Sequence, residues 1–278
     1  MAYQNFCIQQ IDGISYKLKE AFDFSFLKRY GTVFKVFDDQ DSGNICFGLN
    51  IGESNRFVKF AGAPAARAVV TAEDAIANLS RTVSIYKDLA HHNLVKLIVA
   101  EEIGGGFAMI FEWVNAECMC AMYPQSREKF MQMPINTKLN VFDEILCFHA
   151  HVVKCGYIAI DFYDGSIMYD FENNKTIICD IDFYEKAPYT NRMGRMWGSS
   201  RFMSPEEFKL GAKIDEVTNV YAMGATAFAL FGDERDRVIE KWILSEELFH
   251  VAKKAVSDER SQRQQSINKL IEEWEVAK

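Results

Sequence analysis

Two aspartates, Asp161 and Asp182, stand where strand-like segments give way to loops. Residues 157–160 precede the first and residues 176–181 precede the second, and both segments are rich in isoleucine, a β-branched residue that favours strands. The polar stretch 172–175 separates residues 167–171 from the segment that begins at residue 176 and indicates the turn of a β-hairpin. Carboxylates on loops with a rigid base hold metal ions and orient reacting hydroxyl groups. The sequence therefore predicts a site built on these two acids.

A lysine lies on one of the apolar, strand-like segments earlier in the chain. Residues 32–37, 45–51 and 56–60 have the composition of strands and are joined by polar turns, which predicts a three-stranded meander. Lys59 lies in the third segment between apolar neighbours. This pattern fits a lysine that serves a site, and it also fits a lysine that points outward into solvent.

Helical periodicity marks the next element. Thr71 followed by Asp74 predicts a helix start, and apolar residues continue at spacings of three and four to Leu89. The apolar face predicted for this helix consists of Ile76, Leu79, Val83 and Tyr86.

Further along, residues 94–103 and 107–114 flank three consecutive glycines and predict a second hairpin. Helices are predicted for residues 136–155, for residues 217–231 and, as two amphipathic helices, for residues 245–277. Gly156 follows the first of these in the position favoured just past a helix end. The first 30 residues are mixed, with a short amphipathic piece at 15–29 and no motif.

The order of these segments resembles that of eukaryotic-like Ser/Thr protein kinases. The family motifs H-R-D-L-x-x-x-N, D-F-G and A-P-E stand here as AIDFYDGS (159–166), DFY (182–184) and SPE (204–206). The resemblance covers residues 32–274. It implies an α+β, bilobal protein-kinase-like fold: a small antiparallel β lobe with one main helix, residues 1–113, and a larger, mainly helical lobe, residues 114–278.

The resemblance also implies roles for the acids and the lysine. Asp161 would accept the proton of the attacking hydroxyl, and Asp182 would bind Mg²⁺. Lys59 would bind the α- and β-phosphates of ATP. Ser166 stands at the second metal position, where the family has asparagine, and Asp164 is close enough in sequence to assist it. Ser199 stands where Ser/Thr kinases carry the threonine that contacts the catalytic aspartate.

Nucleotide contacts follow from the same resemblance. The backbone of Glu112 and Val114 would bind adenine after a gatekeeper at Phe111, and Glu117 would face the ribose. The turn 38–44 would be the phosphate-covering loop, with Gly43 as its remaining glycine. In another register, residues 31–36 form that loop and residues 45–51 become the third strand, which then lacks a lysine. We prefer the first register because it keeps Lys59.

Several positions depart from the family. Thr82 stands where the family has the glutamate that pairs with the strand lysine, and Asp74 or Glu73 could replace that glutamate only if the helix were shifted. Tyr163 replaces a lysine, and Tyr184 replaces the glycine of D-F-G. These departures favour a second interpretation, a pseudokinase that binds nucleotide or acts as a scaffold. A third, a small-molecule phosphotransferase of the aminoglycoside or choline kinase kind, shares only the Asp161 to Gly165 spacing.

The large-lobe scaffold has two recognisable features. The resemblance implies that Glu206 forms an ion pair with Arg263, which stands in a segment similar to the one that carries the family's arginine. A buried carboxylate left without a partner would cost about 3 to 5 kcal/mol. The apolar segment 217–231 resembles the central buried helix of the family, with Asn219 in place of its usual aspartate. Both features favour a protein substrate over a small molecule.

Composition limits the other functions. A net charge of −8 argues against nucleic-acid partners. The seven cysteines are scattered, which predicts buried, reduced thiols and no zinc site, and His149 and His151 lie too far round a helix to share a metal. No signal peptide or membrane span is evident, so the expected location is the cytoplasm, with no membrane partner.

Overall fold

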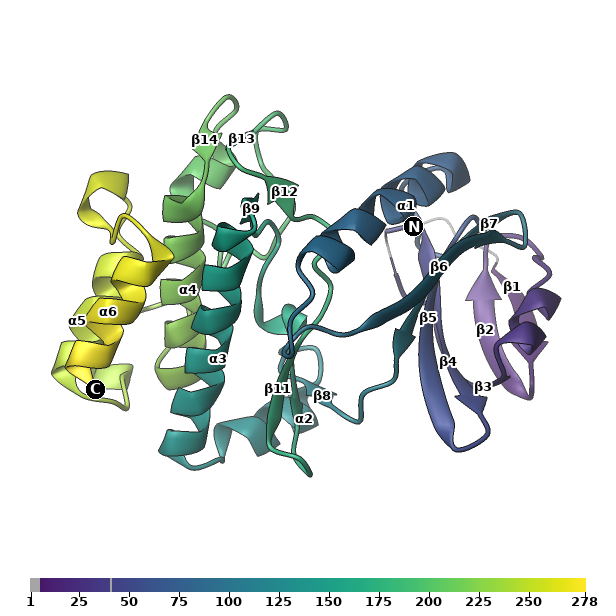
Figure 1. The fold of residues 1–278 in the computed structure, drawn as a ribbon, viewed down its shortest axis with the longest axis horizontal. Helices are drawn as coiled ribbons and strands as arrows, with labels where there is room; N and C mark the ends of the chain where they lie inside the picture. The colour runs from purple at the N-terminus through teal and green to yellow at the C-terminus, as the bar shows by residue number, and fades with distance from the viewer. Residues whose placement is uncertain (1–5, 41) are drawn as a thin grey trace. The chain divides into compact units, whose positions relative to one another are not determined.

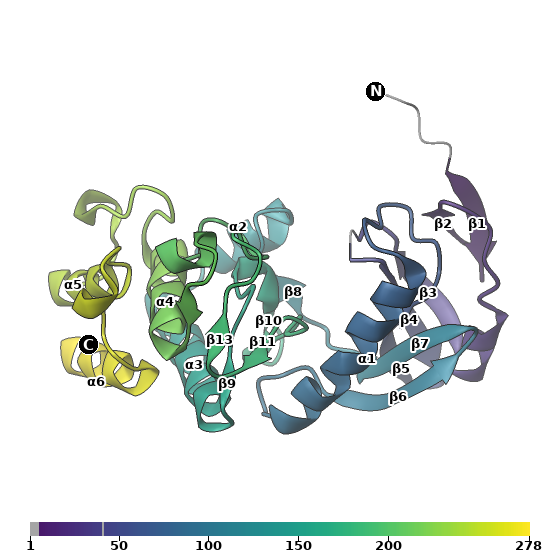
Figure 2. The same ribbon diagram turned by 90° about the horizontal axis from the view of Figure 1, so that it is seen from above.

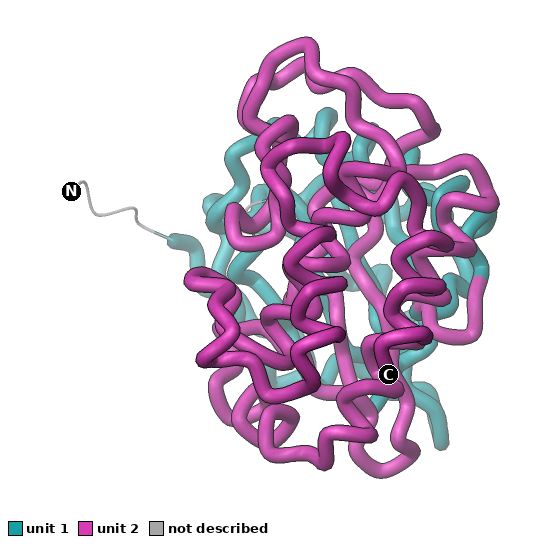
Figure 3. The backbone as a smooth tube through the Cα atoms, turned by 90° about the vertical axis from the view of Figure 1, so that its left-hand side faces the viewer, with its two compact units in different colours: residues 1–90, 95–115 teal, residues 91–94, 116–278 magenta. Residues whose placement is uncertain are grey.

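A computed structural model describes residues 6–40 and 42–278 and shows a mixed α+β fold (Figure 1). Within those residues the chain forms small antiparallel sheets and six α-helices. The chain divides into two compact units, drawn in teal and magenta in Figure 3. Unit 1 comprises residues 1–90 and 95–115, and unit 2 comprises residues 91–94 and 116–278.

Unit 1 is built on an antiparallel sheet whose described strands follow the order β3-β4-β5-β7-β6. These strands are β3 (Thr32–Phe37), β4 (Asn44–Ile51), β5 (Ser54–Ala61), β6 (Leu97–Ile103) and β7 (Gly106–Glu112). The predicted meander and the predicted second hairpin are both confirmed. Gly104 and Gly105 form the turn of that hairpin with φ of 61° and 75°, a region that glycine adopts readily.

One face of this sheet is covered by the N-terminal region. Its elements are β1 (Cys7–Ile11), β2 (Ile14–Leu18) and the 3-10 helix η1 (Ser25–Arg29). Phe24 lies 5.8 Å from Phe60 of β5, measured between ring centroids. The amphipathic piece expected at residues 15–29 is therefore a strand followed by a 3-10 turn, because short segments gain stability from the sheet they cover and not from their own periodicity.

The opposite face is covered by α1 (Ala72–Asp88). The predicted start is confirmed, since the Thr71 side chain accepts a hydrogen bond from the backbone N–H of Asp74 at 3.1 Å. The buried residues of the helix are Ala75, Leu79, Thr82, Ile85 and Tyr86. The predicted apolar face was thus right for Leu79 and Tyr86, whereas Ile76 and Val83 are only partly buried.

Unit 2 is mainly helical. Its helices are α2 (Pro124–Met131), α3 (Ile135–Lys154), α4 (Glu216–Phe231), α5 (Glu246–Ala255) and α6 (Ile267–Ala277). In Figure 1 and Figure 2, α4 lies beside α3 and α5, and it also contacts α6. Nearly every residue of α4 is buried, as its apolar sequence predicted. The four helical segments predicted in this part of the chain are confirmed.

Short strands and 3-10 helices connect these helices. The strands are β8 (Glu117–Cys118), β9 (Tyr157–Ile158), β10 (Ile167–Asp170), β11 (Lys175–Ile178), β12 (Glu185–Lys186), β13 (Tyr189–Thr190) and β14 (Lys213–Ile214). The 3-10 helices are η2 (Asp164–Ser166), η3 (Pro205–Phe208), η4 (Ile239–Lys241) and η5 (Arg260–Gln262). β10 and β11 form the predicted hairpin. Residues 91–94 belong to this unit because the carbonyl of Asn93 accepts a hydrogen bond from the N–H of Ile178 at 2.6 Å.

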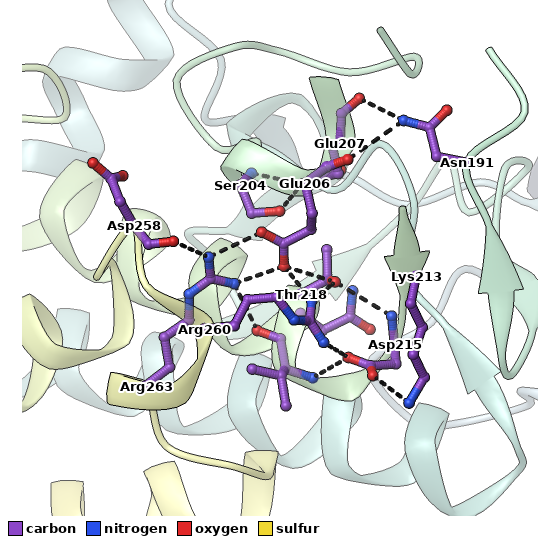
Figure 4. A network of polar contacts seen from close by, with 12 residues as sticks. Asn191, Ser204, Glu206, Glu207, Lys213, Asp215, Thr218, Asp258, Arg260 and Arg263 are labelled. Atoms are coloured by element: carbon purple, nitrogen blue, oxygen red, sulfur yellow. Dashed lines mark hydrogen bonds and ion pairs between the residues drawn. The ribbon is translucent and has the colours of Figure 1, made fainter. Parts of the chain in front are cut away.

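A buried ion pair joins distant parts of unit 2, as predicted (Figure 4). The Arg263 guanidinium donates to both carboxylate oxygens of Glu206, at 2.7 and 2.9 Å, and Arg263 is 2% exposed. Arg260 adds a second ion pair to Glu206, and the Thr218 hydroxyl donates a hydrogen bond at 3.0 Å. Burial alone would raise the pKa of Glu206, but the bonds from Arg263 and the charges of both arginines lower it.

The histidines and cysteines have structural surroundings. His149 is fully buried, with Nδ1 2.8 Å from the carbonyl of Ile145, so this nitrogen carries the proton and Nε2 accepts from the Tyr184 hydroxyl at 3.3 Å. Burial lowers the pKa of His149 to about 4. His149 therefore packs in the interior. Within residues 6–40 and 42–278, no group of three or more His, Cys, Asp or Glu is arranged to hold a metal ion.

All seven cysteines are free thiols, but only Cys46 and Cys120 are buried and Cys147 is exposed. The expectation of buried thiols was therefore wrong for most of them, because Cys7, Cys118, Cys155 and Cys179 are only partly buried and apolar neighbours in sequence do not by themselves bury a side chain. Among the described helices, none combines the length and the apolar character that crossing a bilayer requires.

Replacing Arg263 by Met should lower the free energy of unfolding by about 3 to 5 kcal/mol, because it leaves the Glu206 carboxylate buried with a weaker set of partners. The matched change Arg260→Met should lower it by about 1 kcal/mol, since the Arg260 side chain is 32% exposed and solvent screens its charge. Urea denaturation of both variants measures the difference. Equal losses would contradict the assignment of Arg263 as the principal partner.

Candidate functional site

The backbone that leads to Asp161 is held by α4. The N–H of Ala159 donates to Asn219 Oδ1 at 2.8 Å, and Asn219 Nδ2 donates back to the Ala159 carbonyl at 2.6 Å. Asn219 is 1% exposed, so these bonds form in a low-dielectric interior where they are strong. The amide side chain therefore positions the loop two residues before the candidate base.

Asp161 itself has a left-handed backbone, with φ of 61°. A residue other than glycine in this region stores about 1 to 3 kcal/mol of strain, although aspartate tolerates it better than most. Such a conformation persists where the surrounding structure determines it. The Asn219 contacts provide that constraint, and strain of this kind is concentrated at functional sites.

Asp161 and Ser199 line the same small cavity in unit 2. The cavity has a volume of about 10 Å³, enough for one water-sized group. Gly198 closes one side, where an added Cβ would lie 3.6 Å from Asp161 Oδ1. Ser199 Oγ accepts a hydrogen bond from Arg201 Nε at 3.2 Å. The structure thus brings together two of the residues that the sequence proposed for catalysis.

Glu207 lines this cavity as well, and the sequence analysis missed it. Its carboxylate accepts hydrogen bonds from the backbone N–H of Ser204 at 2.6 Å and from the Ser204 hydroxyl at 3.0 Å, which makes it the second half of a capping box on η3. Burial raises the pKa of Glu207 to about 7, and the negative charge of Asp161 contributes to that rise. The Ser-x-x-Glu spacing was the signal that could have identified it.

A cluster of ion pairs fastens the segment around Ser199 to the loop of Asp161. Arg201 contacts both carboxylate oxygens of Asp164, at 2.9 and 3.0 Å, and Arg127 contacts the same carboxylate at 3.2 Å. Glu234 completes the cluster with an ion pair to Arg201 at 2.6 Å. Asp164 is 3% exposed. Its charge is therefore balanced by arginines, and its suggested assistance to a metal is replaced by a structural role.

Ser166 is the predicted site residue most suggestive of a ligand. It is 1% exposed, and its Oγ has no hydrogen-bond partner among the described residues. The carbonyl of Ser166 accepts a hydrogen bond from the N–H of Cys179 at 3.0 Å. The backbone of the next residue therefore starts close to Ser166. That residue is Asp180, which also has a left-handed backbone, with φ of 57°.

Asp180 is therefore an alternative to Asp182 for the metal-binding role that the resemblance gives to an aspartate after the second strand. The pKa of Tyr163 is raised by burial first and then by the charges of Asp180 and Asp161, so both carboxylates act on this hydroxyl. The sequence analysis counted residues up to 181 as strand, but β11 ends at Ile178. Asp182 follows the fully buried Ile181 and is partly buried. A strand boundary placed three residues too late concealed Asp180.

Tyr163 also shapes the loop between these acids. Its ring lies over Gly165, where an added Cβ would overlap the ring atoms and the hydroxyl. Gly165 therefore matters because it admits a tyrosine ring at this point. The substitution of tyrosine for the family lysine and the adjacent glycine form one packing unit.

Lys59 lies on the face of the unit 1 sheet that α1 covers. It is paired across the sheet with Met109, and opposite residues of an antiparallel pair point to the same side. The Thr82 hydroxyl lies 3.1 Å from Met109 Sδ and donates to the carbonyl of Leu79 at 2.8 Å. Thr82 therefore faces the sheet one strand away from Lys59, at the place where the resemblance puts a glutamate.

The suggested replacements for that glutamate lie elsewhere. Glu73 and Asp74 are exposed in the first turn of α1. Asp74 is eight residues before Thr82, which is about 12 Å along a helix axis. In the helix as it stands, neither acid therefore occupies the position of that glutamate, in line with the expectation that a shift of the helix would be needed.

Aromatic side chains occupy the same face of the sheet. Phe57, two residues before Lys59, lies 5.8 Å from Phe37 and 6.2 Å from Phe111 between ring centroids. Phe34 and Trp113 pack over Gly48, where an added Cβ would lie 2.7 Å and 2.9 Å from their rings. The kinase motif V-A-I-K has alanine at the position of Phe57. That substitution was visible in the sequence and was overlooked.

The acidic turn with Gly43 is held within unit 1. Gly43 has φ of 84° and lies against Val70 and Ala75 at the start of α1. The carboxylate of Asp38 accepts the N–H of Lys17 at 2.7 Å, and Asp39 forms an ion pair with Arg67 at 2.5 Å.

The proposed nucleotide contacts are distributed over both units. The N–H of Glu112 donates to the carbonyl of Lys96 at 3.0 Å, and its carboxylate pairs with the Lys96 ammonium at 2.8 Å. Glu117 pairs with Lys129 at 2.7 Å, and this bond lowers the pKa of Glu117. Unit 1 contains Gly43, Lys59, Glu112 and Val114, and unit 2 contains Glu117, Asp161, Ser166, Asp182 and Ser199.

No protein-family model matches the chain, and no curated protein matches it at a significant level. Function must therefore be argued from the site.

Replacing Glu207 by Gln should change how stability depends on pH. A carboxyl whose folded pKa is raised to about 7 stabilises the fold below its unfolded value of 4.5, and this contribution is lost as pH rises through about 7. Between about pH 4 and about pH 9, the free energy of unfolding of the wild type should therefore fall by about 3 kcal/mol more than that of Glu207→Gln. Contributions from other groups, such as His149, cancel in the difference.

Denaturation of both proteins across this pH range measures the effect. The exposed Glu240→Gln is the matched control for the loss of one carboxylate. Parallel pH profiles for the wild type and Glu207→Gln would contradict the prediction.

Proposed function

We propose that this protein is a divergent Ser/Thr protein kinase that transfers the γ-phosphate of ATP to a hydroxyl group of a protein. The observation that carries the proposal is the placement of Asp161, which is held in a left-handed conformation beside a cavity that it shares with Ser199. A carboxylate there can accept the proton of a hydroxyl that enters the cavity. Phosphoryl transfer depends on such positioning more than on covalent chemistry.

The surrounding contacts support a rigid site. Asn219 holds the backbone before Asp161, and the pair of Arg201 with Asp164 holds the segment after Ser199. Misplacement of a reacting group by about 1 Å can reduce a rate by about 100-fold, so fastening from both sides has direct value for catalysis. Asp161 would orient the hydroxyl and take its proton, and Ser199 would hold the carboxylate in place.

The donor set fits magnesium. Mg²⁺ takes oxygen ligands and usually combines one or two carboxylates with phosphate oxygens. The buried Ser166 hydroxyl, which lacks a partner among the described residues, and the carboxylates of Asp180 and Asp182 are such ligands. When bound, the ion would neutralise charge on the phosphates of ATP. Asp180 is the stronger candidate because its backbone begins beside Ser166.

The arrangement of unit 1 agrees with a kinase small lobe in its order of elements. A meander of three strands precedes one helix and a hairpin, and Lys59 lies on the central strand β5. In a bilobal kinase-like fold, unit 1 would be the small lobe and unit 2 the large one. Lys59 would then bind the α- and β-phosphates, with Thr82 at the position of the family glutamate.

A specific observation favours the pseudokinase as a second candidate. Phe57 fills the space beside Lys59 that an alanine leaves open, and Phe37 and Phe111 lie next to its ring. A sheet face occupied by aromatic rings has less room for a nucleotide. The choice between the two candidates therefore depends on whether these rings admit ATP.

Asp161→Asn should abolish transfer of the γ-phosphate, because the amide cannot accept the hydroxyl proton. Lys59→Ala should also abolish it, because it removes the positive charge that would bind the phosphates. The assay is incorporation of labelled phosphate into the protein itself or into a general acceptor protein, with Mg–ATP. Asp180→Asn and Asp182→Asn form a matched pair, of which the first should be more damaging. Full turnover in Asp161→Asn would show that the base is misassigned.

Phe57→Ala should lower the dissociation constant of ATP several-fold, because it removes a ring from the face that carries Lys59. Phe37→Ala serves as the control, because it removes a neighbouring ring and leaves Phe57 in place. Calorimetric titration with Mg–ATP measures both. An unchanged affinity in Phe57→Ala would mean that ATP does not use this face.

A further inference from the structure

The segment after β13 carries an exposed surface of unusual composition. Arg192, Met193, Arg195 and Trp197 are all exposed, Met193 by 46% and Trp197 by 49%. Phe208 and Lys209, at the end of η3, are exposed next to them, and the Arg195 guanidinium lies 5.9 Å from the centre of the Phe208 ring. We call these six residues the arginine–tryptophan surface. Arginine and tryptophan are the residue types most enriched among the energetically dominant contacts of interfaces.

A buried side chain keeps this surface in one conformation. Asn191 is fully buried, and its Oδ1 accepts the N–H groups of Met193 at 2.9 Å and Gly194 at 3.1 Å. Its Nδ2 donates to the carbonyl of Gly194 at 2.6 Å. It also donates to the carbonyl of Glu207 at 3.1 Å (Figure 4). A loop fixed in this way loses little conformational entropy when a partner binds. The exposed side chains are therefore presented on a preorganised base.

The charge of the surface is opposite to that of the protein. In the fully described segment 189–213 the acids are Glu206 and Glu207, and both are buried. The exposed charges there belong to arginines and lysines, although the whole chain has a net charge of −8. A cationic area on an acidic protein is complementary to an acidic partner, and complementary charge determines which partners are accepted.

The arginine–tryptophan surface adjoins the candidate base. Arg195 donates to the carbonyl of Gly198 at 3.1 Å, and Gly198 is the residue that lies against the Asp161 carboxylate. The ring of Trp197 lies 6.3 Å from that of Phe183, the residue after Asp182. A peptide whose hydroxyl reaches Asp161 would therefore place its neighbouring residues over Gly198 and against this surface.

We infer that the acceptor is a Ser or Thr within an acidic, extended peptide that also carries one large apolar residue. The acidic side chains would pair with Arg192, Arg195 and Lys209, and the apolar residue would pack on Trp197 and Phe208. The inference rests on the proposed function, because it names the substrate class of the same site. It assigns selectivity to residues outside the family motifs.

The test uses three synthetic peptides with one Ser and one Leu each, flanked by Asp and Glu, by Gln, or by Lys. The value of kcat/KM with Mg–ATP should be highest for the acidic peptide, by about tenfold over the neutral one, if two exposed ion pairs contribute near the upper end of their range. The double variant Arg192→Glu/Lys209→Glu should invert this order in favour of the Lys-rich peptide. Neither side chain holds the loop, and the melting temperature checks that the fold is retained.

The control is Lys269→Glu on α6, which changes an exposed lysine and places a glutamate three residues after the N-cap Ser266, an arrangement that suits a helix start. Its peptide preference should equal that of the wild type. If the double variant keeps the preference for the acidic peptide, the inference is overturned.

Failure of the proposed function has a different signature. If the wild type phosphorylates none of the three peptides, fluorescence anisotropy of labelled peptides decides the inference independently. Preferential binding of the acidic peptide that is lost in the double variant would keep the surface as a docking site while removing the kinase assignment. Equal binding of the three peptides would overturn the inference as well.

Discussion

The buried ion pair between Glu206 and Arg263 is the constraint on which the arrangement of unit 2 depends. Neither charge tolerates the interior alone, so the segments that carry them must meet. Thr218 of α4 donates to the same carboxylate, and the next residue, Asn219, holds the backbone before Asp161. One buried helix thus holds both η3, which contains Glu206, and the loop of the candidate base. The spacing of the site follows from this shared support.

The electrostatics of the site result from burial as much as from charge. The charge of Asp164 is balanced by Arg127 and Arg201. Glu207 lines the same cavity as Asp161, and the contacts described for its carboxylate are hydrogen bonds from Ser204. A pKa of about 7 lets Glu207 hold a proton near neutrality and so limits repulsion of Asp161. The exposed positive charges of Arg192 and Arg195 lie on the segment that leads to Gly198. Buried carboxylates and exposed cations are therefore kept apart in this part of unit 2.

Strong local patterns predicted the scaffold well. The capped start of α1, the apolar run of α4 and the glycine turn between β6 and β7 were all found as expected. The pair of Glu206 with Arg263, 57 residues apart, was expected from the family resemblance and not from a local pattern. The hairpin of β1 and β2 was missed because each strand has five residues and depends on the sheet it covers. Asp180 was missed because the end of a strand is decided by its pairing partner, here β10, and not by the isoleucines that continue past it.

The sequence alone determined which residue types are available and in what order, because helix caps, glycine turns and apolar periodicity act over a few neighbouring residues. It also carried the substitution of Phe57 beside Lys59. Only the tertiary structure decided that Asp161 shares a cavity with Ser199 and Glu207, that Asp164 is bound by arginines, and that Thr82 faces the sheet beside Lys59's strand neighbour. Such contacts join residues tens of positions apart, and burial and charge balance select them only when the chain has folded.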